Sequence, residues 1–133
     1  IISDGVLENY LLDTYASRKL KMDCTGNGVL TNVTMNSSKP LVSNMLSTLH
    51  DGVYITDMMG SGANTLTGDY SRGAFGYLVK NGEIQHPVTE ITVASNLSQM
   101  FHNILALGDD IDLRNRIRTG SLLIDNITIG GTN

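Results

Sequence analysis

The stretch GDYSRGAFGYLVKNGEIQHPVTEITVASN, residues 68–96, decides how this chain folds. Asn81 and Gly82 separate two runs of alternating apolar residues, and such a dipeptide is the strongest short-range signal for a two-residue β-hairpin, because both turn positions need a positive φ. The turn fixes the register. It pairs Lys80 with Glu83, Val79 with Ile84, Leu78 with Gln85, Tyr77 with His86 and Phe75 with Val88. We therefore expect one shared apolar face, made of Phe75, Tyr77, Val79, Ile84 and Val88.

Shorter elements are expected before the hairpin. Residues 6–12 have the pattern of a strand, and residues 14–20 that of a short helix that Thr14 or Asp13 can cap. Residues 31–38 show no clear period, which indicates a loop or a weak edge strand. Pro40 favours the start of a helix that runs to Leu49. A strand over 53–59 and a return strand over 64–70 then lead into the hairpin.

The clearest helical pattern follows the hairpin, over residues 97–108, with Asn96 as its cap and Gly108 at its end. This helix is the natural cover for the apolar face of the hairpin. Pro87 should fall opposite Gly76, where a missing N–H donor predicts a bulge, a bend or a sheet edge. Residues 121–129 predict a last strand. The fold class expected is α+β, with a mainly antiparallel barrel-like or sandwich-like sheet in a single domain over residues 1–133.

Composition narrows the functional classes. The 133 residues carry a net charge of −4, and their 9 basic side chains are not clustered, which argues against direct nucleic-acid binding. No apolar run is long enough for a membrane span, and the one cysteine, Cys24, cannot form an internal disulfide. We expect a cytoplasmic protein. Because the chain starts at Ile1 without a Met, we also expect it to be a fragment of a longer protein, with exposed edges that favour self-association.

The segment from Gly68 to Gly73 is the strongest functional candidate, since two glycines bracket Asp69, Tyr70, Ser71 and Arg72. Glycines let another backbone approach closely, so the segment could hold an extended peptide by strand addition. It could equally be a structural corner held by a pair between Asp69 and Arg72. No residue of the chain is assigned a catalytic role.

Metal ligation is not expected in this chain. His50, His86 and His102 are isolated from one another and from Cys24, whereas zinc sites need several ligands at short spacing. His86 is expected to be packed and hydrogen-bonded on the hairpin face, and His102 to face solvent.

Several blocks of this sequence resemble the TldD/PmbA family, the metalloprotease-related "modulator of DNA gyrase" proteins, and within it the PmbA (TldE) branch. The blocks occur in the family's order and are Ser3 to Leu7, Thr14 to Leu20, Thr25 to Asn27, Thr67 to Gly73 and Ile117 to Ser121. The resemblance covers nearly the whole chain, and residues 28–50 are the least alike. It implies the C-terminal domain of a PmbA-like protein.

The resemblance also implies a division of labour between two subunits. The catalytic TldD branch uses an H-E-x-x-x-H type motif, absent here, and a cysteine in the segment that aligns with residues 117–120, where this chain has Thr119. A hydroxyl is a poor Zn²⁺ ligand compared with a thiolate. The resemblance therefore implies that Zn²⁺ belongs to a TldD-like subunit, that the two form a heterodimer acting on peptides, and that Thr119 and Gly120 are substrate or interface candidates.

Two alternatives remain open from the sequence. The longer protein could itself be a metallopeptidase whose ligands precede Ile1. It could also be a binding module that modulates gyrase, but this hypothesis depends on the family's name alone. Because the chain has more acidic than basic residues, direct DNA binding is the weakest hypothesis.

Overall fold

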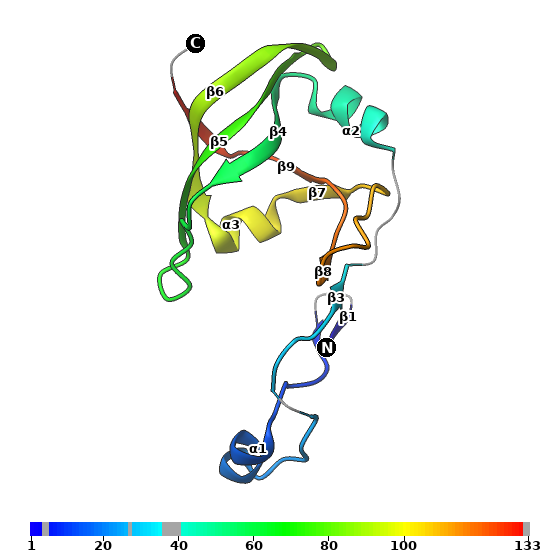
Figure 1. Cartoon of the computed structure of the whole chain (residues 1–133), viewed down its shortest axis with the longest axis vertical. Coiled ribbons are helices and arrows are strands. Elements are labelled where there is room, and N and C mark those ends of the chain that lie inside the picture. The colour runs from blue at the N-terminus through cyan, green and yellow to red at the C-terminus, as the bar shows by residue number, and fades with distance from the viewer. Residues whose placement is uncertain (4–5, 27, 36–40, 132–133) are drawn as a thin grey trace. The chain divides into compact units, whose positions relative to one another are not determined.

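The structure is a computed structural model that describes residues 1–3, 6–26, 28–35 and 41–131. Its contacts divide the chain into two compact units, one made of Ile1–Thr34 with Arg114–Arg118 and the other of Met35–Leu113 with Thr119–Asn133. Antiparallel pairing dominates, with one short parallel pair, and the helices are few and short. The expected α+β class with a mainly antiparallel sheet is therefore confirmed (Figure 1).

The first unit consists of small elements. They are β1 (Ile2–Ser3) paired with β2 (Val6–Leu7), α1 (Thr14–Leu20), and β3 (Val33–Thr34) paired in parallel with β8 (Ile117–Arg118). Asp13 caps α1, as expected, because its carboxylate accepts a hydrogen bond from the Ala16 amide. The strand expected over 6–12 stops at Leu7, since Leu12 instead exchanges hydrogen bonds with Thr25. Leu12 is also the one buried apolar side chain among the described residues of this unit.

The second unit is built on a four-stranded sheet in the order β10-β6-β5-β4. The sheet contains β4 (Gly52–Met59), β5 (Asp69–Lys80), β6 (Glu83–Asn96) and β10 (Thr128–Gly130). The remaining elements are α2 (Val42–Leu49), α3 (Leu97–His102), and the pair of β7 (Ile104–Leu107) with β9 (Leu122–Ile124). The helix expected to run to Leu49 is present, but Pro40, its expected start, lies outside the described residues. No described helix has the length and apolar character needed to cross a membrane.

The hairpin forms at the expected turn, with Asn81 and Gly82 both at positive φ and with Lys80 opposite Glu83. The pairs Lys80–Glu83 and Val79–Ile84 form as expected, but beyond them the expected register of β5 against β6 is wrong by one residue. Two residues of β6, Gln85 and His86, lie opposite Leu78 alone, so a bulge places Pro87 opposite Tyr77 instead of Gly76. The irregularity expected at Pro87 is thus present, but it shifts the pairs of Tyr77 and Phe75.

A second bulge lies farther along the same pair of strands. Val88 pairs with Gly76 and Ile91 with Ala74, so Thr89 and Glu90 lie opposite one residue, and Glu90 has φ 54°. Together the two bulges change which side chains face inward. Ala74, Gly76 and Val79 are buried, whereas Tyr77 and Ile84 of the expected apolar face are exposed. The expected face is therefore wrong at these two residues.

Three other boundaries differ from expectation. The return strand begins at Asp69, because residues 65–67 form a turn. The helix after the hairpin ends at His102, because Ile104–Leu107 pairs with Leu122–Ile124 as a strand. The strand expected over 121–129 is broken at Asn126, which has φ 53°, into β9 and β10.

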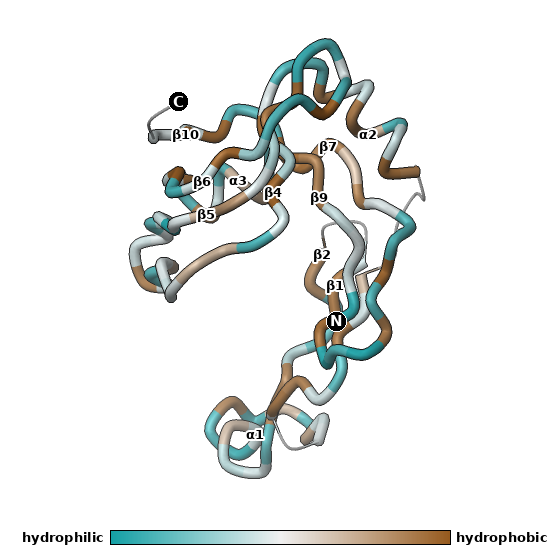
Figure 2. Tube along the Cα trace, turned by 45° about the horizontal axis from the view of Figure 1, so that its top comes forward, coloured by the Kyte–Doolittle hydropathy of each residue, from teal (hydrophilic) through white to brown (hydrophobic). Residues whose placement is uncertain are grey.

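The buried core of the second unit is small. Ala74, Ile91 and Val93 form its centre on β5 and β6, and side chains such as Ile55 and Ile127 pack against them. Apolar residues also follow β4, β7 and β9 in Figure 2. The Asn96 side chain caps α3 as expected by accepting from the Ser98 amide, but no α3 side chain is buried, so this helix covers less of the hairpin than expected.

Candidate functional site

A hydrogen-bonded loop leads into the candidate segment at the start of β5. The Asn64 side-chain oxygen accepts from the amides of Leu66 and Thr67, and the Asn64 amide donates to the Asp69 carbonyl at 2.8 Å. The Gly68 amide closes the turn on the Asn64 carbonyl. These bonds give the loop a defined shape that fixes where Asp69 begins the strand.

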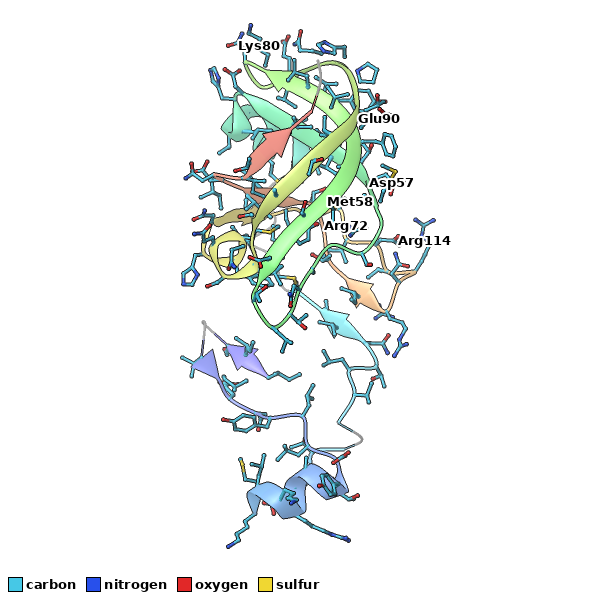
Figure 3. All side chains as sticks on the ribbon, turned by 90° about the vertical axis from the view of Figure 1, so that its left-hand side faces the viewer. Asp57, Met58, Arg72, Lys80, Glu90 and Arg114 are labelled. Atoms are coloured by element: carbon cyan, nitrogen blue, oxygen red, sulfur yellow. The ribbon has the colours of Figure 1, made fainter. Side chains whose placement is uncertain are left out.

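Arg72 does not form the expected pair with Asp69. Its Nε and Nη2 donate to the carbonyls of Met59 and Met58 at 3.3 and 3.0 Å, while Asp69 accepts from the Thr67 hydroxyl at 2.7 Å. Tyr70 donates its hydroxyl to the Met58 sulfur at 3.1 Å. Arg72 on β5 and Met58 on β4 are labelled side by side in Figure 3. Arg72 and Tyr70 therefore hold the end of β4 against β5.

Gly120 lies in a tight corner of main chain before β9. A Cβ on this residue would overlap the Gly108 carbonyl oxygen and lie 2.8 Å from Asp110 Oδ1. The Gly108 amide donates to the Ser121 carbonyl at 2.7 Å, and Ser121 donates its amide and its hydroxyl to the Asp110 carboxylate at 2.8 and 2.6 Å. The Thr119 hydroxyl donates to the Gly120 carbonyl at 3.1 Å. The corner admits glycine only, and Asp110 holds it.

The charge state of Asp110 follows from these contacts. Burial raises the pKa of its carboxyl, but the hydroxyl and amide of Ser121 lower it by more, so the pKa lies below its ordinary value. Asp110 is therefore ionised at neutral pH and accepts both bonds.

A cavity of about 760 Å³ in the second unit brings some of the candidates together. Tyr70 and Arg72 from β5 and Gly120 from the corner before β9 all line it. The other candidates, Asp69, Ser71, Gly73 and Thr119, are not among its lining residues. The candidate segment and the corner are 50 residues apart in sequence, so their convergence on one cavity could not be read from sequence pattern alone.

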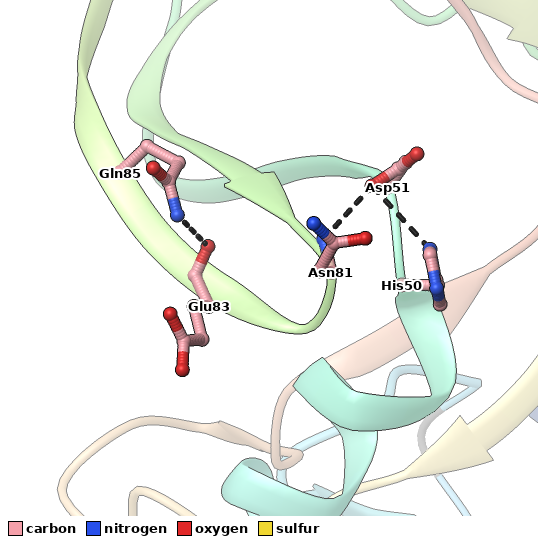
Figure 4. A network of polar contacts seen from close by, with 5 residues as sticks. All are labelled: His50, Asp51, Asn81, Glu83 and Gln85. Atoms are coloured by element: carbon pink, nitrogen blue, oxygen red, sulfur yellow. Dashed lines mark hydrogen bonds and ion pairs between the residues drawn. The ribbon is translucent and has the colours of Figure 1, made fainter.

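The turn of the hairpin is tied to the end of α2 (Figure 4). Asp51 Oδ1 accepts from the Asn81 amide at 2.9 Å, and the Gly82 amide donates to the His50 carbonyl at 2.8 Å. The Asn81 amide is the main cause that lowers the pKa of Asp51; desolvation opposes it, and His50, 3.4 Å away, lowers it further. Sequence reasoning predicted the turn but missed this tie, because only the N-G pair carries a local signal.

The histidines do not make a site. His86 is exposed instead of packed, because the bulge moves it away from Tyr77, and His102 is exposed as expected, with Nδ1 2.7 Å from the Ser98 carbonyl. No three His, Cys, Asp or Glu side chains among the described residues gather as ligands for an ion.

The family model "PmbA/TldA metallopeptidase C-terminal domain" matches residues 1–131, and the chain belongs to this family. It is 46% identical to a metalloprotease PmbA homolog of Haemophilus influenzae, over 98% of this chain and 30% of that protein. It is 24% identical to a metalloprotease TldD homolog of the same organism, over 100% of this chain and 33% of that protein.

A solved structure supports the fold. The crystal structure of a proposed modulator of a DNA gyrase from Thermotoga maritima matches with a TM-score of 0.88 and 29% identity, over 97% of this chain and 32% of that chain. The chain thus spans about 30% of the length of the curated PmbA relative.

Proposed function

We propose that a full-length protein carrying this chain is the non-metal subunit of a two-subunit metalloprotease that acts on peptides in the cytoplasm. The metal-bearing subunit is a TldD-like protein, and Zn²⁺ is its metal. Residues 1–133 form the C-terminal domain of the non-metal subunit. This domain supports the partner and shapes the path of the substrate.

The observation that carries this proposal is the chemistry around Thr119. The sequence resemblance aligns this region with a metal-binding cysteine of the TldD branch, yet here a hydroxyl donates to the neighbouring Gly120 carbonyl. Within the part of the chain that the structure describes, no three His, Cys, Asp or Glu side chains gather as metal ligands, and the Asp110 carboxylate accepts two hydrogen bonds from Ser121. A poor metal ligand in this setting favours a structural role.

Two further observations support a partner. Haemophilus influenzae has both a PmbA homolog and a TldD homolog, and this chain is the more similar to the PmbA homolog. Within the first unit, large apolar side chains are exposed although Leu12 is buried; Val6, Tyr15 and Ile117 are each more than 60% exposed. Side chains this exposed are free to pack against another protein surface.

The direct test is hydrolysis of an unfolded peptide by the TldD-like protein, measured alone and after addition of the full-length protein that carries this chain. We expect activity only in the mixture. A TldD-like protein that is fully active by itself would contradict the proposal.

One alternative has a specific observation in its favour. The PmbA relative is itself named a metalloprotease, so the full-length protein could hold metal ligands outside this chain. Metal content and hydrolysis measured on the full-length protein alone distinguish this alternative from the proposal.

A further inference from the structure

The cavity of the second unit is lined by residues of β4, an edge strand of the main sheet. Figure 1 shows β4 beside β5. Seven consecutive residues, 52–58, line it. The register of β4 shifts between Ile55 and Asp57, and residues on both sides of this bulge line the cavity. Residues 121–127 and one side of α2 form the opposite walls.

The edge of β4 is free for pairing. Its ladder joins it to β5, and among the described residues Gly52–Met59 makes no main-chain to main-chain hydrogen bond with any other segment. The Met58 amide donates to the Asp57 carboxylate. At the far end, Arg72 donates to the carbonyls of Met58 and Met59. The register of β4 shifts between Ile55 and Asp57, so the regular open edge is the four residues 52–55, about 13 Å at roughly 3.3 Å per residue. An extended segment can add to such an edge through main-chain hydrogen bonds.

The floor of the cavity suits apolar side chains of varied shape. Met45, Met58 and Met100 line it together with aliphatic residues such as Leu46 and Ile127. Methionine side chains are flexible and polarizable, and they are common at surfaces that accept many different sequences.

The charge around the cavity is acidic. Asp51, Asp57 and Asp125 are exposed carboxylates of its lining, and Arg72 is its one cationic side chain. The Arg72 donors already serve main-chain carbonyls, so the excess of negative charge is available to an incoming ligand. Charge complementarity therefore favours basic residues beside the apolar ones.

We propose that the edge of β4 and this cavity form a peptide-binding exosite, which takes an extended substrate segment with alternating apolar side chains and basic flanking residues. The segment adds to the sheet as a strand beside β4 and places its apolar side chains on the methionine-rich floor. This inference rests on the proposed function for the source of the peptide, while the binding site itself depends only on the geometry of the second unit.

The test uses the fluorescently labelled peptide Lys-Val-Thr-Val-Thr-Val-Lys. Its binding to the full-length protein is measured by fluorescence anisotropy. Two probes share its length: one with Glu in place of both Lys residues, and one with alternate main-chain amides N-methylated. We expect each of these two probes to bind at least about tenfold more weakly than the Lys-flanked peptide. The Glu probe is repelled by the acidic lining, and the N-methylated probe cannot form the strand hydrogen bonds. Equal affinity for all three would overturn the proposal.

Two pairs of variants locate the binding. Leu122→Trp fills the cavity from a position 41% exposed, and Leu105→Trp is its control, on β7 at 60% exposure and outside the lining. Asp57→Lys reverses one charge of the lining, and Asp109→Lys reverses an exposed charge outside it. We expect weaker binding for the first member of each pair only. Two results would overturn the exosite. One is an equal loss of peptide affinity for both members of either pair. The other is a loss of peptide binding that occurs only when the protein self-associates through the β4 edge.

Hydrolysis by the mixture of the full-length protein with its TldD-like counterpart is measured on the same preparations. If the mixture cleaves peptide while Leu122→Trp binds normally, the exosite fails and the proposed function stands. If no mixture cleaves peptide while the binding pattern holds, the proposed function fails instead.

Discussion

Asp110 and Ser121 are joined by two hydrogen bonds, from the amide and the hydroxyl of Ser121 to the two oxygens of one carboxylate. The contact closes the corner in which the Gly108 amide donates to the Ser121 carbonyl and Gly120 admits no side chain. It fixes the wall of the cavity at the start of β9.

We expect Asp110→Asn to destabilise the full-length protein by about 1–2 kcal/mol, because a neutral amide replaces the charged acceptor of both Ser121 hydrogen bonds. Asp109→Asn is the control, since Asp109 is the exposed neighbour of the Asp110 acceptor. Urea unfolding of both variants checks the prediction. A loss for Asp109→Asn as large as that for Asp110→Asn would show that the Ser121 contacts carry no specific stability.

Acid should weaken the fold through Asp51 and Asp110, whose pKa values are both lowered in the folded state. A carboxyl with a folded pKa below its unfolded value of about 3.9 stabilises the fold above that pH, and the contribution is lost as pH falls through the folded pKa. We expect the double variant Asp51→Asn with Asp110→Asn to lose less stability between pH 5 and 3 than the unmodified protein. Parallel stability curves for the two proteins would contradict this account.

Much of the hairpin could be predicted because its signals are local. Asn81 and Gly82 carry the φ preference of the turn, and Asp13 and Asn96 carry the chemistry of helix caps, so all of these features are found where expected. The bulge at Gln85 and His86 has no such signal beyond Pro87, and one inserted residue is enough to reverse which side chains are buried.

Long-range pairing explains the other differences. Residues 104–107 have a helical apolar period, but their pairing with residues 122–124 makes them a strand. The partner segment is distant in sequence, so no pattern in either segment alone could reveal the pair. The same holds for the candidate site, because the contact of Arg72 with Met58 and the approach of Gly120 to Gly108 exist only in the folded chain.

Gly76→Ala should destabilise the second unit by about 1–3 kcal/mol, because the added Cβ would overlap the Tyr54 carbonyl oxygen of the neighbouring strand. Gly73→Ala on the same strand is the matched control. There a Cβ would lie 3.0 Å from the Met59 Cε, the end of a flexible side chain that can move. Thermal unfolding of both variants measures the difference, and equal melting temperatures would show that β4 and β5 do not approach as closely as described.

Glu90→Gly should stabilise the fold by up to about 1 kcal/mol, because Glu90 has a left-handed backbone in the second bulge and glycine adopts that conformation without steric cost. Thr89→Gly, next to it without a positive φ, should be destabilising. Urea unfolding of both variants measures their free energies of unfolding relative to the unmodified protein. A loss of stability in Glu90→Gly as large as that in Thr89→Gly would argue against this bulge.

The most direct test of the central claim is the metal content and peptide hydrolysis of the full-length protein, measured alone and mixed with its TldD-like counterpart. We expect metal and hydrolysis to appear only when the TldD-like protein is present. Metal-dependent hydrolysis by the full-length protein alone would contradict it and would make this protein a peptidase in its own right.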